Sequence, residues 1–442
     1  MITPSRKEQS EVLFGNSLEH SVSMRFNSKP IGVIPGTVDS GTPVGLFLNE
    51  EAFSKHILLL GGIGTGKTNC MYHLLDIVEQ KLTSKDVVVI FDTKGDFYEK
   101  FYRLGDVVIS NDNTSCGPTG KNYWNVFAEI QPGPQMLESI NEIARMLFAE
   151  ACEKTNQIFF PAAARDIFSA ILYHFIMKAT PAQRTNATLI AFINQCTTKD
   201  LREMLCTYPE FKAMSSYISI DESPQTQGVL SELLQIVKQI FIGNFAAHGN
   251  LGIRDLIHQK EGRKIFIEYD LSVGKVLSPV YSLLFDLAIK EALSRNRTEG
   301  NVYFITDEFR LLPNLEHIDD AVNFGRSLGV KFLVGIQNVE QIYDNYGESR
   351  ARSIMSGFSS IIAFRVNDAK SREYIKELFG KNIKLERYLP SVATKGVIEE
   401  RREAFVVEDW DIANLKIGQA IIGFPGEDPF AFQFDLYQER GR

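Results

Sequence analysis

The sequence predicts an α/β fold with a mainly parallel sheet that is interrupted by an all-helical insertion. The first observation is a pair of continuous apolar runs, at residues 56–60 and 86–92, which is typical of strands buried on both faces. The second is the segment 68–82 between them, whose apolar residues recur at helical spacing. Strand, helix and strand in this order indicate a βαβ unit of a parallel sheet.

The third observation is a change of pattern in the middle of the chain. Residues 132–257 show helical periodicity, as in "MLESINEIARMLFAEA", and continuous apolar strands are missing there. We therefore predict one α/β domain in two pieces, 1–131 and 258–442, separated by an all-α insertion domain at 132–257. In the second piece, alternating and apolar runs predict further strands at 302–309, 330–337, 360–366 and 419–424.

The composition limits the class of protein. Of the 442 residues, 44% are hydrophobic and 23% are charged, and the net charge is −8, which is typical of a soluble globular protein without a basic coat. This net charge does not exclude a nucleic-acid partner that is contacted through a local basic patch or a pore. The five cysteines are scattered without a CxxC pair, which argues against disulfides or structural zinc. Neither a signal peptide nor a membrane span is indicated, so we expect a cytoplasmic chain.

The stretch "GGIGTGKT" fits the P-loop pattern G-x-x-x-x-G-K-[ST] in full, between a predicted strand and a predicted helix. The glycines allow backbone N–H groups to surround a phosphate, and the start of the helix adds its positive dipole end. Lys67 would reach the β- and γ-phosphates, and the Thr68 hydroxyl is a ligand for Mg²⁺. ATP and Mg²⁺ are therefore predicted. The predicted nucleotide-binding residues are Gly61, Gly62, Ile63, Gly64, Thr65, Gly66, Lys67, Thr68 and Asn69.

An acidic pair ends the predicted strand in "VYFITDEF". Asp307 is expected to hold Mg²⁺ through water, and Glu308 to polarise the attacking water. The alternative is an acidic pair that only favours the start of a helix. The presence of a P-loop favours the catalytic interpretation. A glutamate directly after the Mg²⁺ aspartate indicates hydrolysis of ATP rather than transfer of phosphate to another substrate.

Three polar residues near these strands are further candidates. Gln337 follows the strand "KFLVGI" and is expected to contact the γ-phosphate, unless it only caps a loop. Arg326 precedes that strand and is a candidate to neutralise charge at the nucleotide of an adjacent subunit, with a solvated helix arginine as the alternative. Arg365 is a second candidate for the same role.

The motif "FDTKGDF" closes the second predicted strand. Its Asp92 and Lys94 are expected at the carboxyl edge of the sheet, where ligands gather in open α/β folds. They are possible additional contacts to nucleotide, to Mg²⁺ or to a neighbouring subunit, and a simple charged turn is an equal alternative.

These motifs together resemble a known family, the type IV coupling proteins (TraG/TraD-like) of bacterial conjugation and secretion. That family belongs to the FtsK/HerA branch of RecA-like P-loop DNA translocases. The resemblance covers roughly residues 30 to 435, and "FFPAAARDIFSAIL" is similar to a helical segment of the family's insertion. The motifs that carry it, in chain order, are GGIGTGKT, FDTKGD, YWNVF, ITDEF and GIQN.

The resemblance implies a RecA-like core and a homohexameric ring, with ATP between subunits and single- or double-stranded DNA in the channel. It implies P-loop roles for Lys67 and Thr68, Walker B roles for Asp307 and Glu308, and further roles for the residues that match the family's glutamine and arginine motifs, Gln337 and Arg326. The insertion would select substrates or dock a relaxase, the relaxosome or secretion-channel proteins.

One feature departs from the family, whose members usually begin with transmembrane helices. We expect either a relative that has no anchor or a protein whose anchor was removed upstream of Met1. In both cases the chain would be cytoplasmic, with peripheral attachment to the inner membrane through a partner or the removed anchor as an alternative. Two alternatives stay open: a soluble HerA/FtsK-like ATPase of DNA processing or defence, and a nucleotide-regulated adaptor that recruits protein substrates. Basic clusters at 258–264 and 381–395 are candidate DNA contacts, or simply solvated faces.

Overall fold

The computed structural model describes residues 7–20, 30–38, 41–112, 123–294, 298–388 and 398–439. The chain divides into two compact units. The first contains residues 1–82, 305–310 and 331–442, and the second contains residues 83–304 and 311–330. Among the cysteines, Cys116 lies outside the described residues, and Cys70, Cys152, Cys196 and Cys206 are free thiols.

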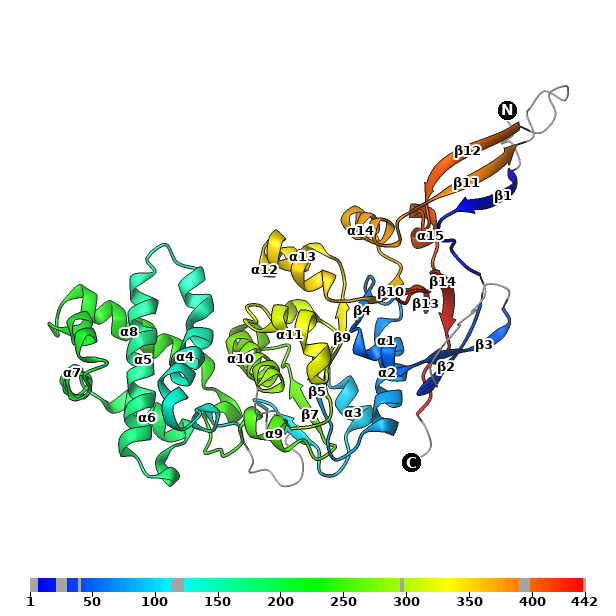
Figure 1. The fold of residues 1–442 in the computed structure, drawn as a ribbon. Coiled ribbons are helices and arrows are strands. Elements are labelled where there is room, and N and C mark those ends of the chain that lie inside the picture. The colour runs from blue at the N-terminus through cyan, green and yellow to red at the C-terminus, as the bar shows by residue number, and fades with distance from the viewer. Residues whose placement is uncertain are drawn as a thin grey trace. The chain divides into compact units, whose positions relative to one another are not determined.

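The first unit contains a parallel group of strands at its centre (Figure 1). β4 (Ile57–Leu60) pairs in parallel with β9 (Val330–Ile336) on one side and with β10 (Ser360–Phe364) on the other. Every residue of these three strands is buried, which explains why their sequences are continuous apolar runs rather than alternating ones. Helix α2 (Lys67–Lys81) follows β4 directly after the glycine loop.

The sheet of this unit continues with antiparallel strands. β10 pairs with β13, β13 with β14, β14 with β2 and β2 with β3, all antiparallel. The antiparallel strands are β2 (Gly32–Thr37), β3 (Pro43–Leu48), β13 (Gln419–Gly423) and β14 (Phe430–Phe434), and the other helices are α1 (Glu50–Ser54), α12 (Glu340–Tyr346), α13 (Glu348–Ser356), α14 (Ala369–Phe379) and α15 (Asp409–Ala413).

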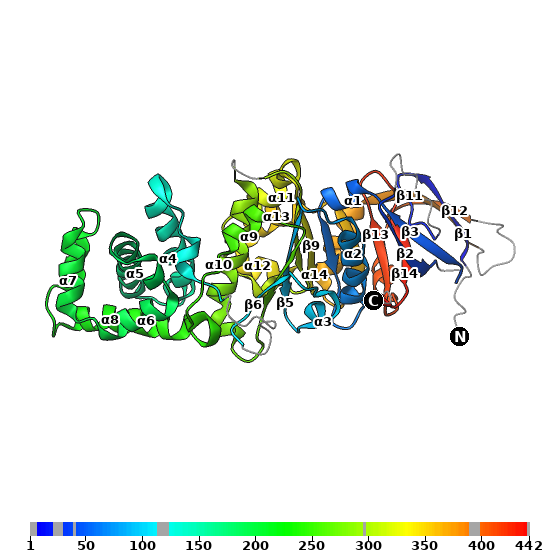
Figure 2. The same cartoon turned by 90° about the horizontal axis from the view of Figure 1, so that it is seen from below.

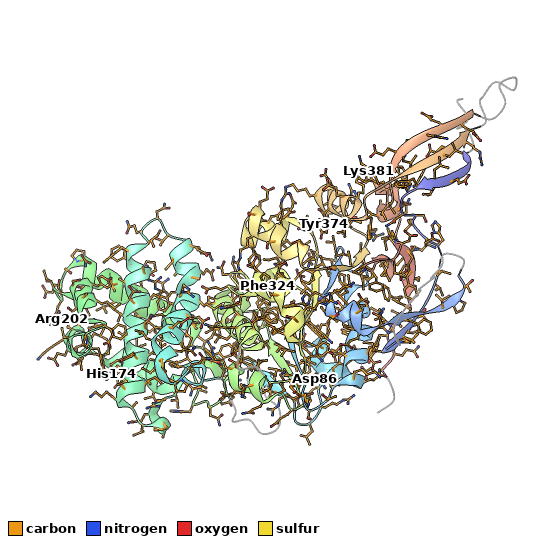
Figure 3. All side chains as sticks on the ribbon, in the orientation of Figure 1. Asp86, His174, Arg202, Phe324, Tyr374 and Lys381 are labelled. Carbon is orange, nitrogen blue, oxygen red and sulfur yellow. The ribbon has the colours of Figure 1, made fainter. Side chains whose placement is uncertain are left out.

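A separate three-stranded antiparallel sheet also belongs to the first unit. It has the order β1-β11-β12, from β1 (Lys7–Phe14), β11 (Lys381–Tyr388) and β12 (Ile398–Phe405). Lys381, which starts β11 after α14, is labelled in Figure 3. Part of the predicted basic cluster at 381–395 forms β11, and residues 389–395 of it lie outside the described residues.

The second unit has its own parallel strands. β7 (Lys264–Glu268) pairs in parallel with β5 (Val87–Asp92) and with β6 (Val107–Ile109). β8 (Val302–Thr306) is divided, because its last two residues belong to the first unit. The helices here are α3 (Asp96–Phe101), α9 (Ile253–Gln259), α10 (Gly274–Leu293) and α11 (Ile318–Phe324), with a 3₁₀ turn at Gly325–Leu328. The α/β class with a mixed, mostly parallel sheet is confirmed.

Five helices form the helical part of the second unit, and Figures 1 and 2 show them gathered beside one another. Helix α5 packs against α4 and α8. Thr185 and Ser223 accept the hydrogen bonds that begin α6 and α8, as Thr and Ser commonly do directly before a helix. The helices are α4 (Met136–Glu153), α5 (Phe159–Lys178), α6 (Asn186–Gln195), α7 (Thr198–Thr207) and α8 (Pro224–Ile240).

Polar contacts also join these helices. His174 on α5 and Arg202 on α7 are labelled in Figure 3. His174 Nδ1 lies 3.0 Å from the Tyr208 hydroxyl, and Arg202 donates to the Ile218 carbonyl at 3.0 Å. Between β6 and β7, the described residues form helices and no named strand, as the periodicity of this segment predicts. The boundaries at 131/132 and 257/258 stay predictions, because the two compact units follow other borders.

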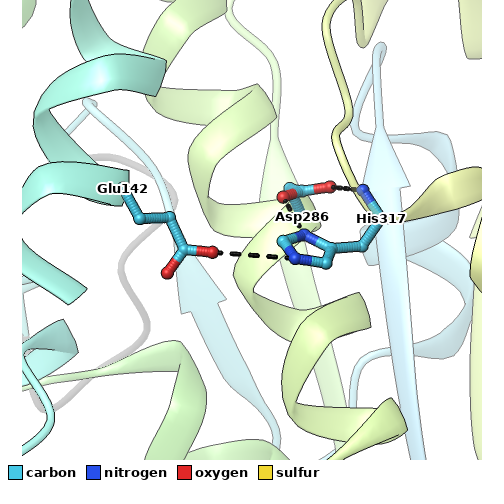
Figure 4. Close-up of side chains that lie close together, drawn as sticks. All are labelled: Glu142, Asp286 and His317. Atoms are coloured by element: carbon cyan, nitrogen blue, oxygen red, sulfur yellow. Dashed lines mark hydrogen bonds and ion pairs between the residues drawn. The ribbon is translucent and has the colours of Figure 1, made fainter. Parts of the chain in front are cut away.

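A buried charge cluster links α4, α10 and the segment before α11 in the second unit (Figure 4). His317 Nδ1 donates to Asp286 at 2.7 Å, and its Nε2 lies 3.8 Å from a Glu142 oxygen. Lys290 and Arg254 contact the two Glu142 oxygens at 2.8 and 2.9 Å. Although one ligand atom from each of the three residues in Figure 4 lies within 4.8 Å of the others, the neighbouring ammonium and guanidinium groups disfavour a metal ion there.

The surroundings of His317 predict a pH dependence of stability. Burial lowers the pKa of His317, but the hydrogen bond to Asp286 and the charges of Asp286 and Glu142 outweigh burial and the repulsion from Lys290, so the pKa lies above its ordinary value. An imidazolium stabilised in this way contributes to folding below the pKa of the unfolded chain. The contribution is lost as the pH rises through the higher pKa of the folded protein.

We expect His317→Gln to lower the free energy of unfolding more at pH 6 than at pH 8.5. Urea titrations of both proteins at the two pH values measure this difference. An equal cost at both pH values would mean that His317 stabilises the fold through packing and neutral hydrogen bonds alone.

Candidate nucleotide-binding site

The glycine loop between β4 and α2 has the backbone that phosphate binding requires. Gly64 and Gly66 have φ angles of 70° and 112°, values that residues with a Cβ adopt only under strain. Gly66 also stands directly before α2, where no side chain caps the helix. No side chain of Gly66 therefore accepts from the first N–H groups of α2. In phosphate-binding sites, the phosphate accepts hydrogen bonds from these N–H groups.

Lys67 folds back over this loop. Its Nζ donates to the carbonyl oxygens of Gly61 and Gly62 at 2.6 and 3.1 Å, and the residue is only 8% exposed. The Thr65 hydroxyl also donates to the Gly62 carbonyl, at 2.8 Å. The loop is thus held in a tight ring with a buried ammonium group inside it. A phosphate oxygen is a stronger acceptor for this ammonium group than a neutral carbonyl.

Thr68 and Asp307 meet although 239 residues separate them in the sequence. The Thr68 hydroxyl donates to Asp307 Oδ2 at 2.6 Å, and Asp307 follows the last residue of β8. The other carboxylate oxygen of Asp307 is buried and has no hydrogen-bond partner among the described residues. A hydroxyl and a carboxylate are the hard oxygen donors that Mg²⁺ takes, and an orphaned oxygen would accept from its bound water. These two residues fit the predicted magnesium ion.

Glu308 lies beside this pair and has two partners. Gln337, directly after β9, donates through Nε2 to one Glu308 oxygen, and Arg310 donates through Nε to the other at 2.9 Å. The structure therefore brings the predicted Gln337 and Glu308 together. Arg310 was not predicted from the sequence. Its position two residues after Glu308 is the only sequence signal for it.

Two predicted residues of the first unit contact the site in other ways than expected. Arg365 uses its backbone carbonyl, which accepts from Gly62 N at 2.9 Å, to hold the glycine loop against the end of β10. Asn69 uses its side-chain amide to bind the C-terminal segment: Nδ2 donates to the Asp435 carbonyl and Oδ1 accepts from Tyr437 N, both at 2.8 Å. Both residues therefore support the loop and its helix.

The remaining predicted residues belong to the second unit. Asp92 is buried and accepts from the backbone N–H groups of Lys94, Gly95 and Tyr98, so it closes the turn before α3. Burial raises the pKa of Asp92 despite these hydrogen bonds. Sequence analysis gave two alternatives for Asp92 and Lys94, a ligand contact or a simple charged turn. The contacts of Asp92 and the backbone contact of Lys94 are those expected of a charged turn. Arg326 lies in the 3₁₀ turn after α11 and is exposed.

Both lysines of the basic cluster at 258–264 are buried. Lys260 and Lys264 are 4% and 2% exposed. Lys260 donates to the carbonyls of Thr298 and Glu299, and Lys264 pairs with Asp106 at 3.1 Å. These two lysines hold the second unit together, and the prediction that this cluster contacts DNA is not supported by their burial.

None of the helices in the described parts of the chain is long and apolar enough to cross a membrane.

The strand–loop–helix geometry, the contact between Thr68 and Asp307, and the adjacent glutamate define an α/β protein with a P-loop nucleotide site. The model of the family described as "Type IV secretion-system coupling protein DNA-binding domain" matches residues 43–431. The chain belongs to this family of type IV secretion coupling proteins.

Curated relatives agree with this assignment. The coupling protein TraD of Escherichia coli (strain K12) is 25% identical over 350 residues, which cover 76% of this chain and 45% of TraD. The type IV secretion system-coupling protein VirD4 of Bartonella henselae is 22% identical over 366 residues, which cover 77% of this chain and 55% of VirD4. The chain thus spans about half the length of these relatives.

Solved structures show the same fold. The bacterial conjugative coupling protein TrwBdeltaN70, in its unbound monoclinic form, has a TM-score of 0.74 at 21% identity and covers 98% of this chain and 94% of its own. The plasmid coupling protein TrwB in complex with ADP and Mg²⁺ has a TM-score of 0.73 at 21% identity, covering 100% of this chain and 97% of TrwB.

The two hydrogen bonds of Asn69 generate a stability prediction. We expect Asn69→Ala to lower the free energy of unfolding by about 1–2 kcal/mol, because two backbone groups of the C-terminal segment lose their partner. Gln80→Ala is the matched control on α2, since that side chain is exposed and bonds only within its own helix turn in the described structure. Urea unfolding measures both variants. Equal costs would show that Asn69 does not hold the segment.

Proposed function

We propose that this chain is the motor domain of a coupling protein that hydrolyses ATP with Mg²⁺ and moves DNA through a homohexameric ring. The single observation that supports it most is the contact of the P-loop Thr68 with Asp307, with Glu308 adjacent. A P-loop alone would bind phosphate, whereas a carboxylate pair beside it provides both a metal ligand and a base. The structures of TrwB with ADP and Mg²⁺ and with a non-hydrolysable ATP analogue lend support from a relative of the same fold.

The proposed chemistry assigns one task to each residue. The backbone of residues 61–68 would surround the β-phosphate, and Lys67 would exchange its carbonyl partners for β- and γ-phosphate oxygens. Thr68 and Asp307 would hold the magnesium ion, which neutralises phosphate charge when it is bound. Glu308 would accept a proton from the attacking water. Gln337, which already contacts Glu308, would sense the γ-phosphate.

Gln337 and Arg310 each donate to one oxygen of Glu308, so together they orient its carboxylate. Each oxygen keeps a further lone pair, which could accept a hydrogen bond from the attacking water.

Membership of the coupling-protein family supports the proposal of a ring that moves DNA. Arg326 is exposed and would reach the nucleotide of a neighbouring subunit, with Arg365 as the second candidate. DNA would pass through the ring channel, and relaxosome or secretion-channel proteins would dock on the helical part. We place the motor on the cytoplasmic side of the inner membrane, attached through a partner or an anchor segment.

Glu308→Gln tests the assignment of the base. We expect ATP turnover to fall by about 10²–10⁴-fold, because general-base catalysis is lost, while ATP binding persists. The measurement is phosphate release with single-stranded, double-stranded and no DNA, together with particle mass. Glu299→Gln is the control, since the exposed side chain of Glu299 pairs only with Lys85 among the described contacts.

The same assay separates the proposal from its alternatives. Turnover that no form of DNA stimulates would contradict a DNA motor. Tight ATP binding without turnover, in the protein with Glu308 intact, would favour a nucleotide-regulated adaptor.

Arg326 is tested by mixing two inactive proteins. We expect Arg326→Ala and Lys67→Ala each to lack turnover, and their mixture to recover part of it. Recovery occurs where the intact P-loop of one subunit meets the intact Arg326 of its neighbour. A mixture that stays inactive, although mass measurement shows mixed rings, would contradict the action of Arg326 across subunits.

A further inference from the structure

Three side chains of α4 contact the segment 314–317, which leads into α11, and Figure 4 shows one of these contacts. The closest is a bidentate ion pair, in which Arg145 donates through Nε and Nη2 to the two oxygens of Glu316 at 2.6 and 2.5 Å. The three α4 residues are spaced by three and then eight positions, so they follow one face of the helix. The contacts, which we call the α4 clamp, are Glu142–His317, Arg145–Glu316 and Glu153–Asn314.

Helix α10 holds the same segment from a second side. Asp286 on α10 is fully buried and accepts from both the backbone N–H and the ring Nδ1 of His317, at 2.9 and 2.7 Å. Glu142 is itself bound by Lys290 on α10 and by Arg254 on α9. Because hydrogen bonds between charged groups are the strong ones, a shift of α4 would carry residue 317 with it or strain these contacts.

The segment continues to Arg326 without a flexible loop. Helix α11 begins at Ile318, and the 3₁₀ turn that contains Arg326 follows it directly at Gly325. Ile318 is buried, and a Cβ on Gly325 would lie 2.9 Å from the Cβ of Val330, so the turn packs closely against the start of β9. A displacement at residue 317 is therefore passed along one short, packed element to Arg326.

The outer side of this element is exposed. Phe324, which is labelled in Figure 3, is 68% exposed, and Arg326 is exposed as well. The backbone before them is held by α4 and α10, whereas their side chains point to solvent. The reach of an exposed arginine is set by the backbone that carries it, so the contacts at residues 314–317 govern where Arg326 can act.

We propose that the α4 clamp positions Arg326 for hydrolysis in the neighbouring subunit, an inference that rests on the proposed function. Arg145 and His317 are then positioning residues, because they act through Arg326 rather than on the nucleotide. The clamp joins a helix of the helical part to this arginine within the second unit. A protein partner that docks on the helical part and displaces α4 would thereby change the rate of ATP hydrolysis in the adjacent subunit.

The test uses mixed rings. Arg145→Ala/His317→Gln removes two of the three clamp contacts, and we expect its turnover to fall roughly tenfold, because a misplaced arginine stabilises the transition state less. ATP affinity and ring mass should not change. When this variant is mixed with Lys67→Ala, turnover recovers, since its intact P-loop then meets a correctly placed Arg326 from the neighbour. A general loss of structure in the variant would not be rescued in this way.

The matched control is Arg165→Ala/His174→Gln, which makes the same two substitutions on α5 of the helical part. Arg165 pairs with Asp166 and His174 with Tyr208, and neither contact involves the segment 314–317. We expect this control to keep full turnover.

Arg145→Ala alone tests the clamp without altering the buried cluster around His317, because the Arg145 side chain is 53% exposed. We expect roughly threefold lower turnover, again rescued by Lys67→Ala. This variant decides the matter if the double variant does not assemble into rings.

Each other outcome overturns the positioning role. Normal turnover of both clamp variants in intact rings would do so and leave the proposed function standing. Lowered turnover that Lys67→Ala fails to rescue, although it rescues Arg326→Ala, would place the defect in the variant's own site. A starting protein without ATP turnover, or an Arg326→Ala mixture that stays inactive, would overturn the proposed function and the role of the clamp with it.

Discussion

The hydrogen bond between Thr68 and Asp307 is the contact on which the site depends. It joins the start of the P-loop helix to the end of β8, two positions that are 239 residues apart in the chain. Both lie at the carboxyl ends of buried strands, where open α/β folds place their ligands. Because β4, β9 and β10 are buried along their whole length, this edge is rigid, and side chains that leave it keep their distances. A catalytic site needs such constant distances more than it needs many contacts.

Glu308 illustrates how a rigid edge positions a side chain. Gln337 and Arg310 each donate to one oxygen of its carboxylate, which fixes its orientation, and each oxygen keeps a lone pair that could accept a further hydrogen bond. The Gln337 amide can donate to either a carboxylate or a phosphate oxygen. Under the proposed function, Gln337 would therefore link the position of the base to the presence of a γ-phosphate.

Much of this site was predictable from the sequence because its signals are local. Gly61 to Thr68 form one continuous motif, and Asp307-Glu308 end a continuous apolar run, so neither needs a partner to be recognised. The burial of Lys260 and Lys264 was not predictable, because their partners at 298, 299 and 106 follow no periodic pattern. The contacts of Asn69 were not predictable for the same reason, because its partners lie 366 and 368 residues later in the chain. Sequence patterns report the environment of a residue along its own element, whereas these contacts join distant elements.

The carboxylates of the second unit's charge cluster and the Asp307 carboxylate of the first unit are satisfied in different ways. In the second unit, Glu142 and Asp286 have cationic or imidazole partners within the protein, so their cost of burial is largely offset there. In the first unit, one oxygen of Asp307 is buried without a partner, and Lys67 is held by neutral carbonyls. An unsatisfied carboxylate oxygen and a buried ammonium group both favour a ligand that brings a cation and phosphates together. Binding of such a ligand would stabilise the folded first unit, and the unpartnered Asp307 oxygen would be one source of its affinity.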